Sequence, residues 1–130
     1  MYAAYAAPED YAVYGSGKIP SEELGRYLRT ASRHIDALTF NRIIGKGFEF
    51  LTEFQKELVK EAVCLQADFE YENADEIDTV LSSYSINGVS AQFGEGWNVM
   101  VQNGIAMRKD TYELLKQTGL TCRVNRRWHP

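Results

Sequence analysis

The stretch that decides the fold is residues 21–38, which read SEELGRYLRTASRHIDAL. Its apolar residues follow one another at spacings of three, one, three, four and three, which places them on one face of an α-helix. They are Leu24, Tyr27, Leu28, Ala31, Ile35 and Leu38. Ser21 stands at the expected N-cap, and Glu22 and Glu23 favour the positive end of the helix. We therefore predict a long amphipathic helix that begins after Pro20.

A second long amphipathic helix is predicted to begin at Thr52. Thr52 and Gln55 form a capping box, in which each side chain accepts a hydrogen bond from the other's backbone N–H. The predicted buried stripe is Leu51, Phe54, Leu58, Ala62, Leu65 and Phe69, and the predicted solvated face is Glu53, Lys56, Glu57, Lys60 and Glu61. Two such helices, joined by a loop of about a dozen residues, pack most simply against each other.

Shorter elements flank these two helices. Pro8 suits a first helical position and Gly15 can end a helix, which predicts a short helix at about 8–14. A last helix is predicted at about 108–118, with Gly119 at its C-cap.

The hydrophobic pattern changes period in the region that follows the second long helix. Residues 81–86 and 89–93 are rich in serine and β-branched side chains, and they flank Asn87-Gly88. Asn-Gly supplies the positive φ angles of a type I′ turn, which predicts an antiparallel hairpin at about 81–93. The fold class is therefore mainly α: a small helical bundle, two long amphipathic helices plus shorter ones, with an inserted β-hairpin. We predict one domain over 1–124 and a flexible C-terminal tail over 125–130.

The composition is that of an ordinary globular domain. The chain has 130 residues, 45% of them apolar and 25% charged, which excludes a collagen-like or wholly disordered chain. Its longest apolar runs are too short to cross a membrane, its start lacks the pattern of a secretory signal, and two cysteines fit a reducing cytoplasm. We therefore expect a soluble cytoplasmic protein.

Charge is distributed unevenly along the chain. The net charge of −4 disfavours non-specific binding of nucleic acid as the main task. Residues 49–78 carry ten acidic side chains against two lysines, and residues 108–130 carry six basic ones against two acidic ones. This asymmetry favours head-to-tail association between copies. The alternative is two solvated faces that never meet.

We find no pattern that predicts an active site. Gly15-Ser16-Gly17-Lys18 resembles part of a phosphate-binding loop, but the positions of the first glycine and of the magnesium-binding hydroxyl hold Ala12 and Ile19. His34, Cys64, Cys122 and His129 do not have the recurring spacing of a zinc site. Cys64 lies within the second long helix and is expected to be a small core residue. We therefore expect no catalytic residue, no cofactor and no metal.

The basic and aromatic end of the chain is the best candidate for binding a protein. Arginine pairs with carboxylates through two hydrogen bonds, and arginine and tryptophan often carry interface energy. The residues concerned are Arg123, Arg126, Arg127 and Trp128. A frayed terminus is the alternative interpretation.

Several phrases of the sequence, taken together and in order, carry a resemblance to a known family. They are Tyr11…Tyr14-Gly15…Ile19-Pro20, ASRHIDALTFNRI at 31–43, YSINGVS at 84–90, YELLKQTGL at 112–120 and Arg123-Val124. In this order they resemble the head–tail connector (adaptor) proteins of long-tailed bacteriophages and prophages.

The resemblance implies a structural role in the virion. Connectors of this family form a ring of about a dozen copies under the portal, extend the DNA channel and present a surface to the next neck protein. They are mostly helical bundles with an inserted hairpin, and they have no catalytic residues or cofactor. DNA would pass through without sequence-specific binding, no membrane would be involved, and assembly would take place in the cytoplasm of the host bacterium.

The interface residues expected on this basis are Asn87, Gly88, Arg123, Arg126, Arg127 and Trp128. Two other classes stay open. One is a small non-enzymatic regulatory module that binds a protein through the tail, and the other is an enzyme whose site is assembled between subunits.

Overall fold

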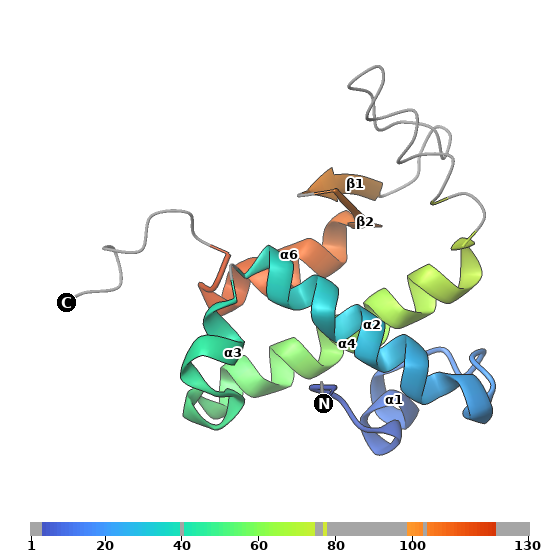
Figure 1. The fold of residues 1–130 in the computed structure, drawn as a ribbon, viewed down its shortest axis with the longest axis horizontal. Helices are drawn as coiled ribbons and strands as arrows, with labels where there is room; N and C mark the ends of the chain where they lie inside the picture. The colour runs from blue at the N-terminus through green and yellow to red at the C-terminus, as the bar shows by residue number, and fades with distance from the viewer. Residues whose placement is uncertain (1–3, 40, 75–76, 78–98, 103, 122–130) are drawn as a thin grey trace.

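Helix α4 (Glu53–Glu72) runs through the middle of the fold, and the other elements pack around it (Figure 1). The computed structural model describes residues 4–39, 41–74, 77, 99–102 and 104–121. Within these residues α4 contacts α1 (Pro8–Tyr14), α2 (Ser21–Leu38), α6 (Lys109–Thr118) and strand β2 (Ile105–Arg108). The predicted architecture, a mainly helical bundle with an antiparallel hairpin, is confirmed.

Because α4 lies at the centre of the fold, the structure confirms only part of what we predicted for this helix. The capping box is confirmed, with Gln55 N donating to Thr52 Oγ1 at 3.1 Å and Thr52 N donating to Gln55 Oε1 at 2.9 Å. The predicted buried stripe was only partly correct, because Phe54 is exposed and Leu65 is half-buried. Neighbours on several sides bury the second half of the helix almost all round, so its burial follows no single stripe.

Helix α2 buries the predicted face. Its buried apolar residues are Leu24, Leu28, Ala31, Ile35 and Leu38, with Tyr27 half-buried at the edge. The prediction of Ser21 as N-cap was wrong by one residue. The carbonyl of Pro20 accepts the hydrogen bonds from Glu23 N and Leu24 N, so Pro20 is the cap and Ser21 is already helical.

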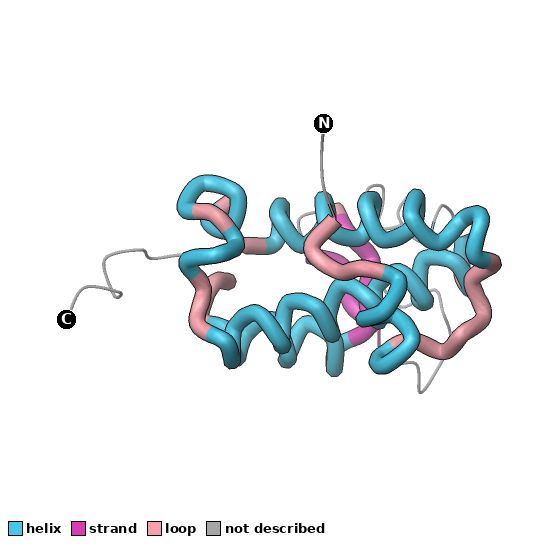
Figure 2. Tube along the Cα trace, turned by 90° about the horizontal axis from the view of Figure 1, so that it is seen from below, coloured by secondary structure: helices cyan, strands magenta, loops and turns pink. Residues whose placement is uncertain are grey.

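The short helix α3 (Arg42–Lys46) and the 3₁₀ turn η1 (Phe48–Phe50) join α2 to α4 at one end of the molecule (Figure 2). The chain reverses between them at Gly47, whose φ of +97° is strained for any residue with a side chain. As a result, Phe48 turns inward and stacks on Tyr5 with 5.3 Å between ring centroids, while Phe50 turns outward.

The hairpin of the structure consists of β1 (Val99–Gln102) and β2, which pair antiparallel with Val99 opposite Arg108 and Gln102 opposite Ile105. Asn103-Gly104 connects the strands, and Gly104 has a φ of +77°. We did not predict this ribbon. The hairpin that the sequence predicts at 81–93, with Asn87-Gly88 at its turn, lies outside the described residues.

The C-terminal part of the bundle follows the prediction closely. Helix α6 begins directly after β2 and ends at Gly119, which is left-handed with a φ of +80°. Leu115 on α6 and Met107 on β2 are fully buried in the same core as Ile35 and Val63. The tail predicted at 125–130 lies outside the described residues.

Candidate functional site

The structure describes the point from which the C-terminal segment starts, but not the segment itself. The predicted interface residues Asn87, Gly88, Arg123, Arg126, Arg127 and Trp128 all lie outside the described residues. Two hydrogen bonds fix the chain at the C-terminal end of α6, which precedes Arg123. Arg42 Nη1 donates to the carbonyl of Leu120 at 2.9 Å, and Gln55 Nε2 donates to the carbonyl of Thr118 at 2.9 Å. The described part of the chain therefore ends beside α3 and the start of α4.

Exposed apolar side chains gather at this same end of the molecule. Among the described residues, four large hydrophobic side chains are exposed, and three of them belong to α3, η1 and the first turn of α4: Ile44 at 55%, Phe50 at 82% and Phe54 at 61%. We call these three residues the aromatic corner; α3, at the left of Figure 1, marks its position. The fourth, Val13 on α1, is 74% exposed and belongs to a different element.

Sequence reasoning placed Phe54 in the core and did not single out Ile44 or Phe50. The helical period of Phe54 matches that of Leu58 and Ala62, but those two residues are buried and Phe54 is exposed. The sequence did contain one signal for an exposed aromatic residue, the run Phe48-Glu49-Phe50-Leu51 just before a helix. The side chains of such a run cannot all point into the core.

Acidic side chains border the aromatic corner. Glu49 and Glu53 are almost fully exposed, and both reach Lys56, whose Nζ lies 3.2 Å from Glu49 Oε1 and 3.6 Å from Glu53 Oε2. The hydrogen bond that Lys56 donates to Glu49 raises the pKa of Lys56 above its ordinary value. One lysine is thus shared by two carboxylates, and each carboxylate keeps most of its surface in water. The corner therefore combines apolar area with negative charge.

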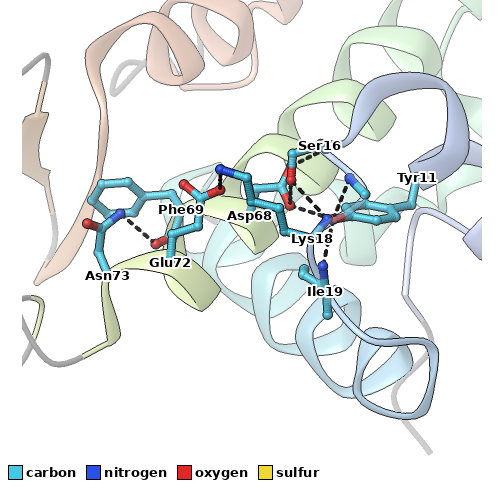
Figure 3. A network of polar contacts seen from close by, with 9 residues as sticks. Tyr11, Ser16, Lys18, Ile19, Asp68, Phe69, Glu72 and Asn73 are labelled. Carbon is cyan, nitrogen blue, oxygen red and sulfur yellow. Dashed lines mark hydrogen bonds and ion pairs between the residues drawn. The ribbon is translucent and has the colours of Figure 1, made fainter.

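The loop that resembled a phosphate-binding loop is already bound to a carboxylate (Figure 3). Asp68 of α4, which is buried, accepts from Ser16 N at 2.6 Å, from Ser16 Oγ at 3.0 Å and from Tyr11 Oη at 2.6 Å. Tyr11 Oη in turn accepts from Gly17 N at 3.1 Å and Ile19 N at 3.2 Å. The loop's N–H groups face Asp68 and Tyr11, so a phosphate would have to displace an internal anion. The arrangement anchors α1 to α4 and supports no nucleotide site.

A second internal carboxylate connects three elements. Glu70 Oε2 of α4 lies 2.5 Å from His34 Nδ1 of α2 and accepts from Gln66 Nε2 at 2.7 Å. Gln66 Nε2 also donates to the carbonyl of Ala106 in β2 at 3.0 Å. The contacts hold α2 and the hairpin against α4. Asp68 and Glu70 are therefore not part of a solvated acidic face, because both are partners of groups in the interior.

The third buried carboxylate belongs to α2. Asp36 Oδ1 accepts from Tyr5 Oη at 2.7 Å, and Tyr5 N donates to Ser32 Oγ at 3.0 Å. Burial raises the pKa of Asp36 to about 6. These contacts hold the segment before α1 against α2, which is a structural task.

Cys64 occupies the core position that the sequence predicts. It is fully buried, and burial is the main cause that raises the pKa of its thiol to about 12. Because the thiolate is the nucleophile, this side chain is unreactive near neutral pH. The other cysteine, Cys122, lies outside the described residues.

Over the described residues, no three His, Cys, Asp or Glu side chains come together as a metal site would require. None of the helices described here is both long enough and apolar enough to span a bilayer. The chain matches no family model, no curated protein and no solved structure.

Proposed function

We propose that this chain is a structural protein of the bacteriophage neck: a head–tail connector that forms a ring under the portal and extends the DNA channel. In this role it would act during head completion and tail joining. The observation that carries the proposal is the architecture. A small helical bundle with an antiparallel hairpin is the fold that the resemblance to connectors implies.

The use of the polar side chains supports a role without catalysis. In the described part of the chain, Asp68 is a partner of α1 and Glu70 of α2, Gln66 is a partner of the hairpin, and Cys64 is a core residue. Groups fully engaged in internal contacts are not available to a substrate. The surface features that remain are exposed side chains suited to contacts with other proteins. We therefore propose a non-enzymatic protein of the virion, assembled in the cytoplasm of the host bacterium.

The partners proposed are other copies of the chain in a ring of about a dozen, the portal, and the next neck protein. DNA would pass through the channel without sequence-specific binding. Two further acids of α4, the exposed Glu57 and the half-buried Glu61, suit a channel wall, because negative charge repels the DNA backbone. Asp68 and Glu70 do not contribute to such a wall, since they are buried.

A protein-binding regulatory module is the second candidate. The aromatic corner favours it, because an exposed apolar patch with a charged border is typical of a protein-binding surface. The two candidates differ in the partner: a connector binds a portal, and a regulatory module does not.

The test is binding of the purified protein to candidate portals by co-sedimentation. We expect the full chain to bind one of them, and the protein lacking residues 125–130 to keep its fold but lose attachment. Salt should weaken binding of the full chain, because it screens arginine–carboxylate pairs, with a screening length of about 10 Å at 0.1 M salt. Undiminished binding by the shortened protein would show that the tail is only a frayed end. Failure of the full chain to bind any portal would favour the regulatory module.

A further inference from the structure

The aromatic corner has the chemistry of a site for a basic and aromatic peptide. It presents Phe50 and Phe54 beside the carboxylates of Glu49 and Glu53, all of them largely in solvent. A ligand for this surface needs an apolar anchor for the rings and cations for the acids. Lys56 neutralises part of the charge, which leaves room for guanidinium groups at the outer carboxylate oxygens.

The chain carries such a peptide at its C-terminal end. Residues 122–130 contain three arginines, no acidic side chain and Trp128. Trp128 supplies a large apolar surface, and Arg123, Arg126 and Arg127 supply planar cations for carboxylates. The charges and the apolar groups of the two surfaces are therefore complementary.

The place where this peptide starts sets its reach. The carbonyls of Thr118 and Leu120 are fixed by Gln55 and Arg42, so residues 122–130 begin at the edge of the bundle. Nine extended residues span about 30 Å. This length is enough to cross from one small domain to the equivalent surface of a neighbour.

We propose that residues 122–130 of one copy bind the aromatic corner of a second copy. The choice of a second copy, in place of the same one, rests on the proposed connector function. A tail on one copy and a corner on the next form a heterologous contact, which repeats from copy to copy and closes into a ring when the rotation allows. The corner is thus the acceptor, and the C-terminal segment the donor, of the contact between ring neighbours.

The test uses the full chain without a portal, in sedimentation velocity over a concentration series at low salt. The corner variant is Phe50→Asp with Phe54→Asp, and the tail variant is Arg126→Glu with Arg127→Glu and Trp128→Ala. Val13→Asp is the control, because it places one such negative charge on a similarly exposed apolar residue of α1, outside the corner. We expect the wild type to self-associate with rising concentration, each variant to associate at least about tenfold more weakly, and the control to match the wild type.

Mixing the two variants separates this contact from all others. The tail variant keeps an intact corner and the corner variant keeps an intact tail, so an equimolar mixture should form a dimer that grows no further. A mixture that stays monomeric would overturn the proposal, and so would wild-type protein that stays monomeric up to about 1 mM. Variants that associate as well as the wild type would also overturn it.

Binding to the portal is measured separately, so the two claims fail independently. Wild-type protein that binds a portal but does not self-associate in its absence would overturn this contact and leave the connector function standing. Self-association through tail and corner without binding to any portal would do the reverse.

Discussion

Three buried carboxylates hold the N-terminal segment, α1 and α2 in their places in the bundle. Asp36, Asp68 and Glu70 each accept hydrogen bonds from a different segment, and all three are buried. From the sequence alone these residues were unremarkable members of charged helices. Their burial depends on partners far along the chain, such as Tyr11 for Asp68, and no local pattern reveals which acid will meet which tyrosine.

Asp36 should make the protein less stable as pH rises. Its pKa in the folded state is about 6, above the ordinary 3.8, so between these values the folded protein holds a proton that the unfolded chain has lost. The contribution of Asp36 to the free energy of unfolding is therefore full below about pH 4 and lost as pH rises through 6. Asp36→Asn should remove this dependence.

Urea unfolding of wild type and Asp36→Asn, at pH values from about 4 to 7, measures this effect. The stability difference, wild type minus variant, should fall as pH rises through the window and then level off. A difference that is constant or rises with pH would show that Asp36 is charged in the folded protein throughout.

Asp68 should matter far more than the serine that it binds. Removing the carboxylate leaves Tyr11 Oη without its acceptor in the interior, so Asp68→Ala should lower the free energy of unfolding by about 2–4 kcal/mol. Ser16 is exposed and water can replace its hydroxyl, so Ser16→Ala should cost about 0.5–1 kcal/mol. Chemical denaturation of both variants checks this, and equal losses would contradict the role of Asp68 as the anchor.

At the scale of elements, a helix could be predicted from the sequence where one of its faces packs against a single neighbouring element. The stripe of α2, the capping box at Thr52 and the glycine after α6 all follow from local rules, and the structure confirms them. The β1–β2 ribbon escaped prediction although Asn103-Gly104 is the same signal as Asn87-Gly88. Its strands, VMVQ and IAMR, do not alternate clearly between apolar and polar residues. This matches their surroundings, since three successive residues of β2 are buried.

The aromatic corner could not be predicted either. A helical period indicates which residues share a face, but not where a neighbouring helix ends and leaves that face uncovered. Phe54 lies on the same face as Leu58, yet only Leu58 is buried. The candidate interface at the C-terminal end, by contrast, is a prediction from composition alone, because arginines and a tryptophan follow the last predicted helix.

The sequence contains two Asn-Gly pairs, and replacing the glycine of each by valine allows a comparison between the two positions. Gly104 has positive φ and lies between strands that pack against α4 and α6, so Gly104→Val should cost about 1–2 kcal/mol of stability. Gly88→Val should leave helix content nearly intact, because the hairpin predicted there is expected to project from the bundle and act in assembly. Circular dichroism with thermal unfolding checks both. Global unfolding by Gly88→Val would place that turn in the core.

At the scale of the whole molecule, its internal polar contacts and its exposed features have separate places. Polar side chains of the interior, namely Asp68, Glu70 and Gln66, hold α1, α2 and the hairpin against α4. The exposed side chains of Ile44, Phe50 and Phe54 lie at one end of the bundle. The last described residues of the chain lie at this same end. A protein built in this way offers its neighbours a surface and a peptide, which is what a self-assembling ring requires.

Electron microscopy of the protein mixed with a candidate portal tests the connector function most directly. We expect class averages along the portal axis to show a closed ring of about a dozen copies bound at one face, with an open channel through both rings. The portal alone is the control. A monomer in the absence of the portal is compatible with the connector function, since the portal can act as the template, although it would overturn the contact between tail and aromatic corner. Portals that bind the protein without ring symmetry, or that do not bind it at all, would contradict it.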